Sequence, residues 1–139
     1  MIFHELQVRY VRQTGEEGPR KAKEIYLVEG ATTFGDAEKC VSTEVQPFVF
    51  EGDIEVRNCK LSQFQEIFPN EGGAFWYKGR VELLTIDGDK ETRKNVAVLV
   101  EANTIDDAVF ALKQGMNSYD CELISIAKTQ IMDIIHAVK

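Results

Sequence analysis

The chain has 139 residues, of which 44% are hydrophobic, and this is the size and composition of one ordinary domain with a real core. Its 16 Lys and Arg residues against 23 Asp and Glu residues give a formal net charge of -7. This charge argues against broad, non-specific nucleic-acid binding, which needs an excess of cations. No apolar run approaches the roughly 20 residues that span a bilayer, so no membrane segment is expected.

The first residues and the cysteines predict a cytoplasmic protein. The opening segment MIFHELQVRYVR alternates between apolar and polar residues and carries charge, which is not typical of a signal peptide. Cys40, Cys59 and Cys121 are widely spaced, odd in number and form no CxxC pair. We therefore expect free thiols in a reducing compartment.

Two similar halves make up the chain. The segment YLVEGATT at residues 26–33 returns as VLVEANT at residues 98–104, and further matches follow in the same order. Two copies are too few for a solenoid. The sequence therefore predicts a single domain, 1–139, made of two internal repeats, 1–69 and 74–139, that are related by a pseudo-twofold axis.

The first repeat begins with two predicted strands. Leu6, Val8 and Tyr10 alternate with polar residues, which is typical of a half-buried strand. A loop rich in Gly and Pro at residues 14–19 leads to a second strand at residues 24–29. These segments predict a hairpin.

A predicted helix, strand and short helix complete this repeat. Thr33 and Asp36 have the hydroxyl-then-carboxylate spacing of a capping box. A third strand is expected at residues 54–61, and a short helix is expected from Ser62 onward on its capping hydroxyl. Residues 69–73 then read as a linker. The residues predicted to share the buried helical face are Phe34, Ala37, Val41 and Val45.

The second repeat has the same order of elements. Strands at residues 76–86 and 95–101 flank the tight turn signal Asp87-Gly88. The run 96–100 is apolar at every position, so we expect a strand that is covered on both faces or lies against a partner subunit.

The second repeat closes as the first one does. Thr104 and Asp107 predict a helix start, a third strand is expected at residues 121–128, and a short helix is expected from Thr129 onward. The residues predicted to share the buried face of this helix are Ile105, Ala108, Leu112 and Met116.

These elements predict the α+β class. Each repeat reads as strand, strand, helix, strand and short helix. If the hairpin partner lies between the strands joined by the helix, each repeat is a split βαβ unit, as in ferredoxin-like folds. We expect the helices on one sheet face, with the other face open or packed against another chain.

Several short motifs give the chain a family resemblance. They are Tyr26-Leu27-Val28-Glu29, Glu66-Ile67-Phe68, Trp76-Tyr77-Lys78, Leu99-Val100-Glu101-Ala102 and Thr129-x-x-Met132-Asp133. With them the chain resembles, over nearly its whole length, a family of small proteins from gut bacteria and their phages, labelled only as a domain of unknown function. The resemblance implies a phage or mobile-element gene. It brings no catalytic residues.

Metal, cofactor and catalytic sites are not expected from the motifs. His4 and His136 lie at opposite ends of the chain without ligands at metal-binding spacing. No nucleophile elbow, P-loop or dinucleotide fingerprint is present. We therefore predict no metal, no cofactor and no catalytic residue.

Carboxylates at matching positions form the one candidate for acid–base work or cation binding. The matched pairs are Glu29 with Glu101, Glu55 with Glu122, and Glu66 with Asp133. A pseudo-twofold axis would bring such a pair together. The alternative is that the duplication copied solvent-facing residues.

The candidate ligand site is an aromatic and basic segment at the start of a strand. Trp76 and Tyr77 offer stacking faces for a base, and Lys78 and Arg80 offer cations for phosphate. Arg9, together with Arg57, extends this segment if their strands neighbour it. Amides at the helix starts near Thr33 and Thr104 are a further candidate anion site. Core or interface packing is the alternative for the aromatic residues.

The leading hypothesis is a non-enzymatic, self-associating binding protein of a phage or mobile element. Its expected partners are a second copy of the chain and a small anionic or nucleotide-type ligand of a host defence system. The first alternative is an accessory factor in replication that binds a protein or single-stranded nucleic acid, although the acidic charge weighs against nucleic acid. The second alternative is a small enzyme that uses a symmetric carboxylate pair.

Overall fold

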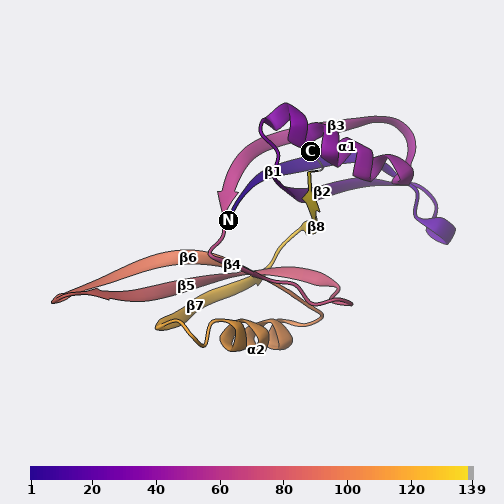
Figure 1. Ribbon diagram of the computed structural model, residues 1–139. Helices are drawn as coiled ribbons and strands as arrows, with labels where there is room; N and C mark the ends of the chain where they lie inside the picture. Colours follow the sequence, from indigo (N-terminus) through magenta and orange to yellow (C-terminus); the bar gives the residue numbers. More distant parts are fainter. Residues whose placement is uncertain (138–139) are drawn as a thin grey trace. The chain divides into compact units, whose positions relative to one another are not determined.

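The computed structural model of the protein describes residues 1–137. The chain forms two compact units, and each holds one four-stranded mixed sheet and one α-helix (Figure 1). The β1 unit takes Ile2–Ser62 and the C-terminal segment from Ile131 onward, and the β5 unit takes Met1 and Gln63–Gln130.

The β1 unit is built mostly from the first repeat. Its sheet has the strand order β3-β1-β2-β8. One 3-10 turn follows β1 and a second one follows the helix. The elements are β1 (Ile2–Arg12), η1 (Gly15–Glu17), β2 (Arg20–Glu29), α1 (Phe34–Val45), η2 (Gln46–Phe48), β3 (Val49–Gln63) and β8 (Ile131–His136).

The β5 unit is built mostly from the second repeat. Its sheet has the strand order β4-β6-β5-β7. The hairpin turns at Gly88, whose φ of 63° lies in the left-handed region that favours glycine. The elements are β4 (Glu66–Phe68), β5 (Phe75–Asp87), β6 (Lys90–Ala102), α2 (Ile105–Gly115) and β7 (Cys121–Lys128).

The two halves share a strand-strand-helix-strand pattern, as predicted. In the first half β1 lies between β2 and β3, the two strands that α1 connects, and in the second half β5 lies between β6 and β7. In Figure 1 each helix lies along one face of the sheet of its own unit.

The predicted short helices at the end of each repeat are wrong, because both segments are strands. The segment after Ser62 contains β4, and the segment after Thr129 is β8. The Thr129 hydroxyl donates to the carbonyl of Trp76 at 2.8 Å instead of capping a helix. A single capping hydroxyl is a weak signal, and β-branched and aromatic residues such as Ile131 and Phe68 suit a strand.

Within the chain, the last strand of each half joins the sheet of the other half. Strand β4 comes from the first repeat and pairs in parallel with β6 of the second, with Ile67 opposite Leu99. Strand β8 comes from the second repeat and pairs in parallel with β2 of the first, with Ile135 opposite Val28. Each sheet is therefore completed by a strand from the other repeat.

The helix starts form as the capping signals predict. The Thr33 hydroxyl accepts a hydrogen bond from the backbone N–H of Asp36 at 3.1 Å, and Thr104 accepts one from Asp107 at 3.1 Å. These bonds satisfy amides that lack an intrahelical partner.

The predicted buried faces of the helices are correct except at the first helical position. Ala37, Val41 and Val45 are buried in α1, and Ala108, Leu112 and Met116 are buried in the second half. Phe34 is 41% exposed and Ile105 is 47% exposed. Both begin their helices, and Phe34 packs edge-to-face against the ring of His4, with 4.8 Å between the ring centroids.

Each helix covers an apolar cluster on its own sheet. The cluster under α1 includes Leu6, Val8 and Val28, and the cluster under α2 includes Val81, Val98 and Val100. Leu99, which alternates with Val98 and Val100 and so points to the opposite face, is also fully buried. The second part of the apolar run in β6, Val98 to Val100, is thus buried on both faces, whereas Val96 and Ala97 are partly exposed.

Candidate functional site

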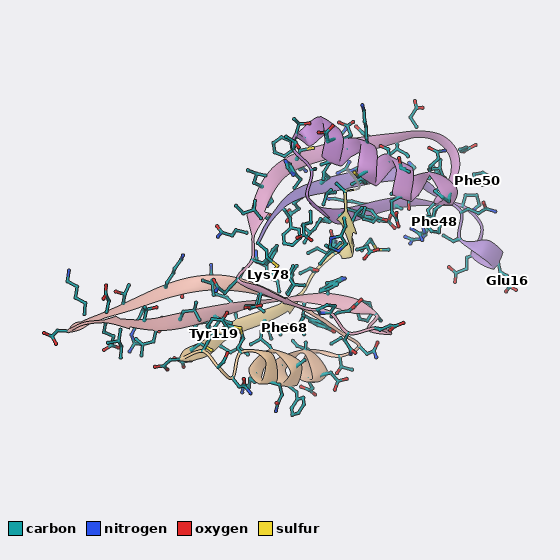
Figure 2. All side chains as sticks on the ribbon, in the orientation of Figure 1. Glu16, Phe48, Phe50, Phe68, Lys78 and Tyr119 are labelled. Atoms are coloured by element: carbon teal, nitrogen blue, oxygen red, sulfur yellow. The ribbon has the colours of Figure 1, made fainter. Side chains whose placement is uncertain are left out.

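The predicted aromatic and basic segment does not form an exposed stacking surface. Trp76 is 6% exposed and Tyr77 is 4% exposed, so both rings belong to the interior. Because neighbours in a strand point to opposite faces, Tyr77 joins the cluster under α2 while Trp76 points away from it. Lys78, labelled in Figure 2, is exposed. Arg80 is exposed as well. The segment therefore presents cations without the predicted aromatic partners.

The strands that were expected to extend this segment lie in the other sheet. Arg9 is on β1, whose neighbours are β2 and β3, and Arg57 is on β3. Neither strand is a neighbour of β5, so the condition under which Arg9 and Arg57 would extend the segment is not met. Arg57 is instead engaged by Glu55, with 2.6 Å between the charged atoms.

Three of the carboxylates at matching positions, Glu29, Glu101 and Glu66, have local partners. Glu29 lies 2.7 Å from Nδ1 of His136, and Glu101 accepts a hydrogen bond from the backbone N–H of Asn70 at 3.0 Å. Glu66 accepts one from the hydroxyl of Tyr119 at 2.6 Å. Within residues 1–137, no three His, Cys, Asp or Glu side chains are grouped as metal ligands.

A cleft of about 470 Å³ on the β1 unit is lined by three cations that have no ion pair among residues 1–137. Its walls come from β1, β2 and β3. One wall is acidic, from Glu51, Asp53 and Glu55 of β3. The basic residues of the lining are Arg9, Lys21 and Lys23. We call these three residues the basic cluster.

The basic cluster places like charges against each other. Arg9 and Lys23 are direct cross-strand partners in the antiparallel β1–β2 pair. Lys21 lies two residues before Lys23 on β2 and so points to the same face of the sheet. Among residues 1–137 none of the three makes an ion pair within 4.0 Å. An anion bound between them would relieve this repulsion.

The matching position in the second repeat carries opposite charges. The alignment of the repeats puts Glu82 at the place of Arg9 and Arg93 at the place of Lys21. Glu82 and Arg93 form an ion pair at 2.9 Å. The direct cross-strand match of Arg9 and Lys23 in the second half is Glu82 with Asn95, so two cations face each other there only in the first half. The sequence prediction named Arg9 only as an extension of the Trp76 segment and did not name Lys21 or Lys23, whose signal is the spacing of cations in Lys21-Ala22-Lys23.

On the α1 face of the same sheet, a buried carboxylate holds a polar network. Glu24 is 3% exposed and accepts hydrogen bonds from the hydroxyls of Tyr10 at 2.7 Å and Tyr26 at 3.1 Å. The guanidinium of Arg12 donates to it at 2.9 Å and stacks on the ring of Phe48, 4.4 Å from its centroid. Sequence reasoning missed this network, although Glu24 falls in phase with the apolar positions of β2.

Burial and the neighbouring carboxylate keep both tyrosines neutral. Desolvation, and then the hydrogen bond to Glu24, raise the pKa of Tyr10 to about 12. Desolvation and the charge of Glu24 also raise the pKa of Tyr26 well above its ordinary value. With every member bonded, the network stabilises the fold and offers no free acid or base for chemistry.

Together these features define an α+β protein of two similar halves with two mixed four-stranded sheets and a charged cleft on one of them. Residues 2–137 match the family model described as domain of unknown function DUF4494, and the chain belongs to this family. No curated protein and no solved structure matches the chain. Neither described helix is long and apolar enough to cross a membrane.

Proposed function

We propose that this protein is a non-enzymatic binding protein that captures a small anionic ligand of the nucleotide type in the cleft of the β1 unit. The observation that carries the proposal is the position of Arg9 directly opposite Lys23, with no ion pair to either residue among residues 1–137. Like charges directly opposite each other in a sheet reduce stability, and a bound anionic ligand would offset this repulsion.

The rest of the cleft supports a ligand that is more than a phosphate. Glu51 and Asp53 of β3 line the same cleft as the cations, and carboxylates accept hydrogen bonds from sugar hydroxyls and base amino groups. The volume of about 470 Å³ falls within the range of small-molecule sites. A nucleotide combines both kinds of group, with phosphate oxygens for the basic cluster and hydroxyl or amino donors for the acids.

The proposal also includes self-association and a phage or mobile-element setting, in which the ligand is a signalling nucleotide of host defence. The family resemblance supports the setting. We further propose that the halves are related by an approximate twofold axis and that each derives from a ferredoxin-like split βαβ unit. The shared strand-strand-helix-strand pattern supports that origin.

Isothermal titration calorimetry with mononucleotides, cyclic dinucleotides and inorganic phosphate tests the ligand. We expect at least one nucleotide to bind the wild-type chain, and the double variant Arg9→Ala/Lys23→Ala to bind it at least about tenfold more weakly, because charge-assisted hydrogen bonds are lost. Lys90→Ala, which removes an exposed cation at the tip of the β5–β6 hairpin, is the matched control and should bind normally.

Two results would contradict the proposal. Absence of binding to every nucleotide in the panel removes the ligand class. Equal affinity in the wild type and the double variant removes the cleft as the site. A salt-dependent mobility shift with single-stranded DNA, in place of nucleotide binding, would favour the accessory-factor alternative.

A further inference from the structure

Strand β8 completes the sheet of the β1 unit from the far end of the sequence. It pairs in parallel with β2 from Ile25 to Glu29 and forms the edge of the sheet beside it. Its Ile131 is buried, and Ile135 packs against the cluster under α1. The β1–β2 hairpin therefore depends on a partner strand that no nearby segment of the chain supplies.

Without β8, β2 would become an unprotected edge. Leu27 and Val28 are fully buried in the complete sheet, and both lie on the stretch of β2 that β8 pairs with. An apolar edge with unpaired amides and carbonyls recruits another strand. The strand that fits its register and side chains is β8, whether it comes from the same chain or from a second copy.

The connection before β8 is short. Only Thr129 and Gln130 separate the end of β7, in the β5 unit, from the start of β8, in the β1 unit. Short connections of this kind favour exchange of an element between copies, because the exchanged strand makes the same contacts and the hinge alone changes.

We propose that two copies of the chain exchange β8, so that the β8 strand of each copy completes the β3-β1-β2 sheet of the other. The pairing of Val28 with Ile135 and the contact of Glu29 with His136 then form between chains. This inference rests on the self-association part of the proposed function and says how two copies would associate. It does not involve the ligand cleft.

Engineered disulfides test the exchange. Glu29 and His136 are register partners at the end of the β2–β8 pair, and neither is buried, so cysteines there should cost little stability. In a background with Cys40, Cys59 and Cys121 replaced by serine, a tagged Glu29→Cys chain and an untagged His136→Cys chain are unfolded together, refolded and oxidised. Exchange predicts a non-reducing gel band at the summed mass of the two chains.

Controls make each outcome decisive. A tagged Glu44→Cys chain, with its cysteine on the exposed side of α1, replaces the Glu29→Cys chain and should give no such band. The double variant Glu29→Cys/His136→Cys reports correct pairing through loss of both free thiols. If that variant oxidises only within one chain and the mixture gives no summed band, the exchange is overturned.

Light scattering and calorimetry separate this inference from the proposed function. A dimer without the interchain band means association through another surface, which overturns the exchange and leaves self-association standing. Nucleotide binding is measured independently on the wild type, because Arg9 and Lys23 do not lie on β8. Loss of the ligand proposal therefore leaves the exchange intact, and the reverse also holds.

Discussion

The hydroxyl of Tyr10 donates a 2.7 Å hydrogen bond to the carboxylate of Glu24, and this bond crosses from β1 to β2 in the interior of the sheet. Glu24 also accepts from Tyr26 and Arg12, so a charge that is costly to bury is fully bonded. The network therefore fixes the hairpin that carries the basic cluster on its other face.

Loss of the Glu24 carboxylate should destabilise the fold strongly. Glu24→Leu leaves the guanidinium of Arg12 and two buried hydroxyls without their acceptor, and we expect a loss of about 3 kcal/mol in the free energy of unfolding. Glu24→Gln keeps an acceptor oxygen and should cost less. Urea denaturation followed by circular dichroism compares the two, and equal losses would contradict this account.

Stability should fall at alkaline pH because of the buried tyrosines. The folded-state pKa of Tyr10 is about 12, above its ordinary value of 10.0, so its contribution is complete below that ordinary value and is lost as the pH rises toward 12. The pKa of Tyr26 is shifted in the same direction. Together they should remove on the order of 2 kcal/mol or more of stability. Denaturant midpoints measured at increasing pH check this, with Tyr10→Phe as the comparison whose decline should be shallower.

The two capping threonines should each stabilise the helix that they begin. Thr33→Ala and Thr104→Ala remove the acceptors for the amides of Asp36 and Asp107, and each should cost about 1 kcal/mol. Thr43→Ala, at an exposed position inside α1, is the control and should be neutral or slightly stabilising. Thermal unfolding curves of the three variants test the difference.

Two glycines should respond to alanine in opposite directions. A Cβ at Gly79 on β5 would overlap Cδ1 of Leu112, a buried residue of α2, so Gly79→Ala should cost about 1–3 kcal/mol. A Cβ at Gly35 in the first turn of α1 meets only the Thr33 hydroxyl at 3.7 Å, so Gly35→Ala should be neutral or stabilising. Chemical denaturation measures both, and a neutral Gly79→Ala would mean that Leu112 relaxes freely.

Local features of the fold could be predicted because neighbouring residues decide them. The Thr33 and Thr104 caps, the hairpin turn at Gly88 and the alternation in β1 all depend on residues a few positions apart. The pattern of two similar halves followed from the same local signals, which recur in the same order.

The candidate site could be predicted only in part. Arg9 was named only as an extension of the Trp76 segment, and its neighbours Lys21 and Lys23 become visible only when the β1–β2 register is known. Trp76 and Tyr77 were expected to meet a ligand, and the sheet buries them. An aromatic ring in a strand looks the same in sequence whether its face meets solvent or the interior.

The sequence by itself determined the capped helices, the hairpins and the pattern of two similar halves, since these follow from signals carried by residues close together in the chain. The tertiary structure decided where the closing segments go. Glu66–Phe68 and Ile131–His136 are too short to hold a helix alone, and each becomes a strand because the open edge of the other repeat's sheet pairs its backbone.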